Sequence, residues 1–142
     1  MSASLVPPPP PSFSMGGPVR GRVASIIVYG AKDAQSQLHR FEALIDTGAT
    51  ATTIKDSQAQ ALGLRMLRRQ QFNTANGPVV LTVYAMHVIV GGRQQNLVLR
   101  KTIEVVGSTN LFGEMLYGMD MLSEGTLTMT LDAHGNGNWD WR

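Results

Sequence analysis

Short hydrophobic runs recur along most of the chain, and glycine or polar residues separate them. In the first half, runs rich in β-branched and aromatic residues cover residues 22–29, 38–45 and 51–54. The second half repeats this character at residues 69–74, 78–90, 94–106 and 126–132. Runs of this composition, bounded by turn residues, predict β-strands.

The hydrophobic period changes at two places. Ser57 to Gln60 has the Ser-x-x-Gln form of a capping box, and the residues that follow favour a short helix that ends at Gly63. A second short helix is expected near residues 120–124. Many short strands with glycine turns and two brief helices predict an all-β fold, either a barrel or a sandwich.

One hairpin has a specific sequence signal. Ala75, Asn76 and Gly77 lie between two strand-like runs. Asn-Gly in this position is typical of a tight β-hairpin, because such a turn needs residues that tolerate positive φ. We therefore expect the chain to reverse direction at these residues.

The two ends of the chain differ from the middle. Residues 1–18 include five consecutive prolines, which favour the extended polyproline II form and supply no backbone donors. We expect a disordered tail there, most simply a spacer; a ligand for a proline-reading module and a piece removed on maturation are the alternatives. Residues 134–142 carry two tryptophans among glycines and asparagines and are turn-like. A single domain is therefore expected at residues 19–133, with a tail on each side.

Composition narrows the class of protein. The chain has 142 residues, no cysteine and a formal net charge of +2. Without cysteine, a disulfide scaffold, a thiolate zinc site and a cysteine nucleophile are excluded. The basic residues form no dense stripe with interleaved aromatics, so no nucleic-acid partner is expected. No apolar run reaches the roughly eighteen residues of a membrane helix. Because the N-terminus also lacks the pattern of a signal peptide, we expect a cytoplasmic protein with no membrane partner.

The residues that are candidates for a catalytic role lie between Phe41 and Thr50. An apolar run leads directly into Asp46, and Thr47 and Gly48 follow as a turn. At the end of a buried run, desolvation and hydrogen bonding both act strongly on a carboxyl group. A glycine beside it lets other backbone approach closely. An ordinary Asx turn is the alternative interpretation of these three residues taken alone.

Residues 43–49, Ala-Leu-Ile-Asp-Thr-Gly-Ala, resemble the active-site motif of retropepsin-like aspartic proteases, the single-domain relatives of pepsin. Residues 115–122, Met-Leu-Tyr-Gly-Met-Asp-Met-Leu, resemble the second signature of the same family, in which a glycine precedes the C-terminal helix. The hairpin signal lies between them, where bacterial members carry a flap. The resemblance covers residues 22–132, and it implies a retropepsin-like closed barrel of short strands with a flap hairpin and one or two short helices.

The resemblance also implies an activity, that of an aspartic endopeptidase working as a homodimer. Each chain supplies one Asp-Thr-Gly, so two copies of Asp46 would hold a water between them and hydrolyse a peptide bond in a peptide or protein substrate. Two carboxylates at close range cannot both ionise, so one acts as base while the other donates to the scissile carbonyl. No cofactor is implied. The three histidines lack the spacing of a metal triad, so no metal site is expected.

Further site residues follow from the same resemblance, in three groups. The loop would bond across the dimer and border the substrate backbone through Thr47, Gly48 and Ala49. The flap would close over an extended peptide at Ala75, Asn76 and Gly77. The second signature would pack beneath the catalytic loop and shape adjacent subsites with Leu116, Tyr117 and Gly118, and it would bring the tyrosine hydroxyl near the site.

The chain departs from viral members of this family in several positions. Thr50 stands where those members usually have an acidic residue and Met119 where they have an arginine, so the ion pairs of the viral dimers are missing. Asp120 is expected to act as the N-cap of the last helix. The C-terminal end does not resemble the strand that viral chain ends contribute to the dimer. A catalytically silent module that binds peptides or dimerises is therefore the alternative function.

Overall fold

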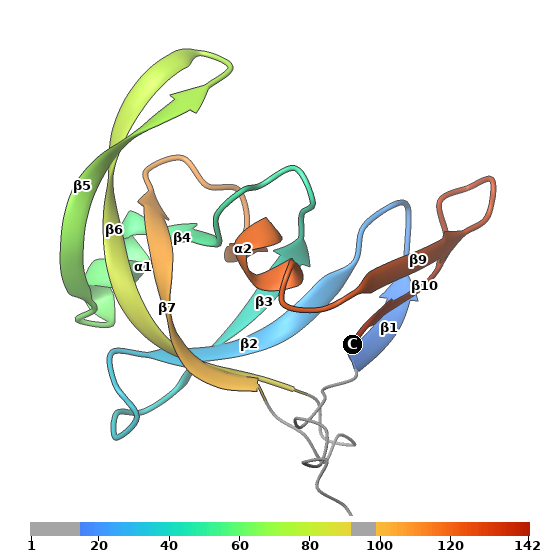
Figure 1. The fold of residues 1–142 in the computed structure, drawn as a ribbon, viewed down its shortest axis with the longest axis horizontal. Coiled ribbons are helices and arrows are strands. Elements are labelled where there is room, and N and C mark those ends of the chain that lie inside the picture. Colours follow the sequence, from blue (N-terminus) through green and yellow to red (C-terminus); the bar gives the residue numbers. More distant parts are fainter. Residues whose placement is uncertain (1–14, 92–98) are drawn as a thin grey trace, which may run out of the picture.

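The computed structural model describes residues 15–91 and 99–142, in which β-strands predominate (Figure 1). The strands are β1 (Met15–Val19), β2 (Ser25–Ala31), β3 (His39–Ile45), β4 (Thr53–Lys55), β5 (Arg65–Thr74), β6 (Gly77–Val90), β7 (Leu99–Ser108), β8 (Met115–Tyr117), β9 (Leu127–Leu131) and β10 (Gly137–Trp141). The helices are α1 (Asp56–Ala61) and α2 (Met119–Leu122).

Six of the strands close into a barrel. They pair in the order β2-β3-β8-β4-β7-β6, and β6 pairs back with β2, so that Val28 lies opposite Val90. The pairs β3–β8 and β4–β7 are parallel, whereas the other pairs of the ring are antiparallel. β5 extends the sheet beyond β6. The prediction of an all-β closed barrel with a hairpin and two short helices is confirmed.

The barrel interior is filled by the alternating apolar residues of its strands. On β3, the buried side chains are Phe41, Ala43 and Ile45, and the residues between them are exposed or half-buried. Met86 and Val88 of β6 are fully buried in the same core. Burying a side chain of this size contributes about 1.5–3 kcal/mol, so β3 is held firmly up to its last residue.

Helix α1 begins two residues earlier than the capping box predicts. Its N-cap is Lys55, which makes no side-chain cap bond, and the Gln60 side chain donates to the Asp56 carboxylate at 2.7 Å. The capping-box prediction at Ser57 is therefore wrong. The predicted stop is confirmed, because Gly63 has a φ of 68°, a conformation that glycine adopts without strain.

The C-terminal end forms a strand, contrary to the sequence-based expectation. β10 lies between β1 and β9 in a separate antiparallel three-stranded sheet. Trp139 and Trp141 both point to its buried face, and the Trp141 indole N–H donates to the Leu122 carbonyl at 3.0 Å. The turn-like interpretation holds for residues 134–136 but was wrong for residues 137–141, because the glycines and asparagines concealed the two-residue spacing of the tryptophans.

The N-terminal strand β1 includes residues that the sequence placed in a tail. Met15 to Pro18 pair with β10, and Met15 and Val19 are buried. The rest of the predicted tail, residues 1–14, lies outside the described residues, as does part of the strand predicted at 94–106. Neither helix found in the described ranges has the length and apolar character needed to span a bilayer.

Candidate active site

Strand β3 delivers Asp46 to the end of the barrel. Ile45, the last residue of β3, is buried; Asp46 is half-buried, and Thr47 and Gly48 are exposed. The Asp46 backbone N–H donates to the Tyr117 carbonyl at 3.1 Å, so the ladder between β3 and β8 continues to the acid itself. The backbone that carries the carboxyl group is thus fixed by the sheet.

The loop after Asp46 folds back on the carboxyl group. The Gly48 N–H donates to Asp46 Oδ1 at 2.9 Å, and the Ala49 N–H donates to the Asp46 carbonyl at 3.2 Å. A backbone donor to one carboxylate oxygen orients the group and leaves the other oxygen for further partners. The Asx-turn geometry and an active-site role are therefore compatible at this residue.

A set of hydrogen bonds ties this loop to the start of α2, and we call it the loop clasp. The Met119 N–H donates to the Ala49 carbonyl at 2.8 Å, and the Asp120 N–H donates to the Thr50 carbonyl at 3.2 Å. A Cβ on Gly118 would lie 2.8 Å from the Ala51 carbonyl carbon. The glycine of the second signature therefore permits the loop and α2 to touch.

Asp120 belongs to the loop clasp and is not the N-cap of α2. The N-cap is Gly118. The Asp120 carboxylate accepts from the Thr52 N–H at 3.0 Å and from the Thr52 hydroxyl at 2.8 Å. That hydroxyl accepts in turn from the Gly118 N–H at 3.2 Å. The N-cap prediction was wrong because aspartate is favoured in the first turn of a helix whether or not it caps it.

Thr52 is a residue that sequence reasoning missed. Its side chain is fully buried, and its hydroxyl both donates and accepts within the loop clasp. Buried hydroxyls require such partners, because an unpaired one costs about 1–3 kcal/mol. Three other threonines surround it in the sequence, at 47, 50 and 53, and nothing local distinguishes them.

The second signature lies beneath the loop. β8 runs parallel to β3, with Leu116 opposite Leu44 and Tyr117 opposite Ile45. The Tyr117 ring packs edge-on against Trp141, with 5.4 Å between ring centroids. Its hydroxyl is buried and meets no hydrogen-bond partner in the described part of the chain. Burial, followed by the charges of Glu124 and Asp120, raises the pKa of this hydroxyl.

A cleft of about 490 Å³ separates the loop from the β5–β6 hairpin. Gly48 and Ala49 line one wall, and Asn76 and Gly77 line the other. Apolar side chains between them belong to Phe72, Val79, Leu81 and Val106. The structure therefore brings predicted loop and hairpin residues to one cleft. Asp46, Thr47, Ala75 and the predicted residues of the second signature, Leu116, Tyr117 and Gly118, are not among the residues that line it.

The hairpin reverses where its sequence signal predicts. Thr74 pairs with Gly77 across the turn, and its hydroxyl donates to the Gly77 carbonyl at 2.6 Å. Gly77 has a φ of 104°, which favours glycine. Residues Asn73 to Asn76 are exposed, and the tip rises beyond the barrel at the upper left of Figure 1.

In the residues that the structure describes, no three His, Asp or Glu side chains gather into a metal-ligand set. The site therefore offers one carboxylate on an ordered loop, backbone donors beside it and an adjoining cleft with both apolar and polar lining.

Comparisons with known proteins agree with this geometry. The family model for the gag-polyprotein putative aspartyl protease matches residues 33–124, which include the loop, the hairpin and the second signature. No curated protein matches the sequence. A retropepsin-like aspartic protease from Rickettsia conorii is 18% identical with a TM-score of 0.54, over 92% of this chain and 94% of that one. The simian foamy virus (mac) protease is 18% identical with a TM-score of 0.48, over 70% of this chain and 92% of that one. The fold is therefore that of the retropepsins, and the chain belongs to the gag-polyprotein putative aspartyl protease family.

Proposed function

We propose that this protein is an aspartic endopeptidase in which Asp46 is the catalytic residue. The observation that carries the proposal is the position of Asp46. It directly follows the buried end of strand β3, a backbone donor orients its carboxylate, and the loop that follows lines a cleft with apolar side chains at its centre. A carboxylate at such a position acts as base on a water or, when protonated, as donor to a carbonyl oxygen.

The reaction needs a second carboxylate, and the chain has a single Asp-Thr-Gly. A homodimer would place two copies of Asp46 around one water. The ionised copy would take the proton of the water as it attacks the peptide carbonyl. The protonated copy would donate to the carbonyl oxygen, and this proton sharing follows from the repulsion of two close carboxylates.

Two surfaces support a dimer of this kind. Thr47 and Gly48 are exposed next to Asp46, where a second loop could meet them. In the described residues, the sheet of β1, β10 and β9 leaves the outer edges of β1 and β9 unpaired, and Met129 and Leu131 of β9 are exposed. The sequence-based objection that the C-terminal end forms no strand no longer holds, because β10 is one.

The proposed substrate is an extended peptide between the loop and the hairpin. Such a peptide would present alternate side chains to the two sides of the cleft. Phe72, Leu81 and Val106 line it and favour apolar side chains near the scissile bond. The exposed hairpin could close over the bound peptide and exclude water.

The test is cleavage of an unbiased peptide library by the parent protein and by Asp46→Asn at several pH values. The asparagine keeps the size of the side chain, so a loss of at least about a thousandfold in the variant would be a chemical effect. Cleavage by the parent alone would establish the protease. Equal cleavage by both proteins would refute it. If the parent protein forms a stable dimer but cleaves no peptide, the result would favour the peptide-binding module.

A further inference from the structure

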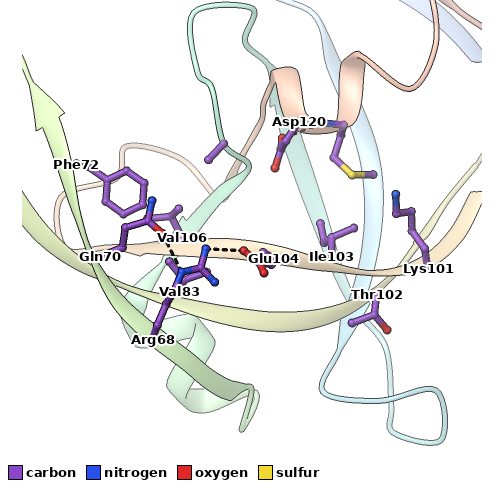
Figure 2. Close-up of a pocket in the computed structure, with 12 residues that line it drawn as sticks. Arg68, Gln70, Phe72, Val83, Lys101, Thr102, Ile103, Glu104, Val106 and Asp120 are labelled. Atoms are coloured by element: carbon purple, nitrogen blue, oxygen red, sulfur yellow. Dashed lines mark hydrogen bonds and ion pairs between the residues drawn. The ribbon is translucent and has the colours of Figure 1, made fainter.

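A second hollow of about 340 Å³ adjoins the candidate active-site cleft (Figure 2). The two share three lining residues, Ala51, Phe72 and Val106. A peptide lying in the cleft could therefore place one side chain in this hollow without leaving its extended course. The volume lies near the lower end of the range for small-molecule sites, about 300–1,000 Å³.

The hollow has apolar walls. Val83 and Ile103, on neighbouring strands β6 and β7, are buried, and Met121 of α2, which is also buried, lines the hollow with them. These side chains, together with the Phe72 ring, offer surface to an aliphatic stem. Long side chains with charged ends bury their stems in this way while the charged end stays near water.

The polar rim has one carboxylate without a cationic partner. Arg68 pairs with Glu104 at 2.7 Å and also donates to the Gln70 side chain at 2.9 Å. Lys101 pairs with Glu124, which lies outside the hollow. No Lys or Arg of the described residues pairs with Asp120, whose neighbours are the Thr52 N–H, the Thr52 hydroxyl and the Met121 N–H.

The lining residues carry two cations and two carboxylates, but Lys101 is paired with Glu124 outside the hollow, so Asp120 is the carboxylate left without a cation. The lining residues and their direct ion partners comprise two cations, Arg68 and Lys101, and three carboxylates, Glu104, Asp120 and Glu124. Glu104 offsets Arg68 and Glu124 offsets Lys101, so the charge of Asp120 remains. Figure 2 shows Asp120 at the α2 side of the hollow, across from the Arg68–Glu104 pair.

We propose that this hollow is a subsite for a lysine or arginine side chain of the substrate. This inference rests on the proposed function. The aliphatic stem lies along Ile103 and Met121, and the charged end meets the Asp120 carboxylate. A glutamate in the same place is disfavoured, because it would face that carboxylate. The enzyme thus selects peptides with apolar residues at the cut and a basic residue at one position farther along.

The test uses a peptide that the parent cleaves, with lysine, glutamine, glutamate or norleucine placed at each position outside the cleaved pair. We expect one position at which kcat/KM for lysine exceeds that for glutamine by about three- to fivefold, as for a partly exposed charge pair. Equal use of lysine, glutamine and glutamate at every position would overturn the proposal.

Two variants identify the carboxylate. Asp120→Asn should abolish the preference for lysine, whereas Asp33→Asn in the distant β2–β3 turn should keep it. Glu104→Gln avoids the loop clasp and frees Arg68, so it should lower the lysine-to-glutamine ratio and improve cleavage of the glutamate peptide. The ratio of kcat/KM for the lysine and glutamine peptides is measured within one preparation of each variant. A change in the fraction of folded protein affects both values equally and therefore cancels. An unaltered lysine-to-glutamine ratio in Asp120→Asn would overturn the proposal.

A binding readout separates this inference from the proposed function. If no peptide is cleaved, the same lysine and glutamate peptides are added to the intact protein and the methyl resonances of Ile103 and Met121 are followed by NMR. Shifts caused by the lysine peptide and reduced in Glu104→Gln would support the subsite although the protease proposal had failed. No shift with any peptide would overturn the subsite.

Discussion

The two walls of the candidate cleft differ in how they are held. The loop after Asp46 is tied to α2 by the loop clasp, with bonds from Met119 and Asp120 to the loop and a buried threonine between them. The β5–β6 hairpin is held by its own ladder and by turn bonds of Thr74, and its tip is exposed. One wall is tied to a second element at several points, whereas the tip of the other is held by bonds within its own hairpin.

This difference suits the proposed chemistry. A catalytic carboxylate must keep its orientation, because reorganisation during the reaction raises the barrier. A wall that admits an extended peptide must open and close, and segments with few buried contacts do so at low cost. Matched substitutions in the two walls should therefore have unequal effects.

The largest difference is expected between two glycines. Gly118→Ala would place a Cβ 2.8 Å from the backbone of Ala51, so we expect a loss of about 3 kcal/mol in the free energy of unfolding and loss of cleavage. At Gly77 the space is open and the φ of 104° is the obstacle, so Gly77→Ala should cost about 1–2 kcal/mol. Urea unfolding of both variants checks this. Equal losses would show that the loop is no more tightly packed than the hairpin.

A smaller difference is expected between two threonines. Thr52→Val removes a buried hydroxyl that serves Asp120 and Gly118, and we expect a loss of about 1–3 kcal/mol in stability together with a lower kcat. Thr74→Val removes exposed turn bonds and should cost under about 0.5 kcal/mol. Thermal unfolding and peptide kinetics measure both. A larger effect at Thr74 would contradict the role given to the loop clasp.

The smallest effects concern two buried tyrosines. Tyr84 donates to the Asp56 carboxylate at 2.7 Å, so Tyr84→Phe should lose about 1 kcal/mol, whereas Tyr117→Phe removes an unpartnered hydroxyl and should be neutral or slightly stabilising. Denaturant unfolding at neutral pH distinguishes the two variants. A loss at Tyr117 as large as that at Tyr84 would contradict this account of the buried hydroxyl.

The same tyrosines predict how stability depends on pH. Burial raises the pKa of both hydroxyls in the folded protein, with the Asp56 bond adding at Tyr84. Above about pH 10 the unfolded chain therefore loses these protons before the folded protein does, and the free energy of unfolding falls as pH rises. Unfolding curves between pH 8 and 11 in each Phe variant should show a shallower fall than in the parent.

The parts of this molecule that sequence reasoning predicted are those with a local signal. A hydrophobic run identifies β3, Asn76 and Gly77 identify the hairpin, and the Asp-Thr-Gly identifies the loop. The partnership of Thr52 and Asp120 has no local signal, because the two residues are 68 positions apart and each has an ordinary local role.

β10 was missed for a different reason. Its Trp-x-Trp spacing fits a strand with one buried face, but Gly135, Asn136, Gly137 and Asn138 beside it are typical of turns. Pairing with β1 and β9 outweighs that local preference. The subsite beside the cleft could not be predicted either, because its lining comes from five separate segments of the chain.

The central claim is that each active site needs Asp46 from two chains. Parent and Asp46→Asn proteins are mixed in different ratios while unfolded, refolded together, and assayed at constant total concentration. If two carboxylates share one site, activity falls as the square of the parent fraction, so an equal mixture retains about a quarter of the parent activity. Activity that falls linearly, to about a half, would mean that each chain acts alone and would contradict the account.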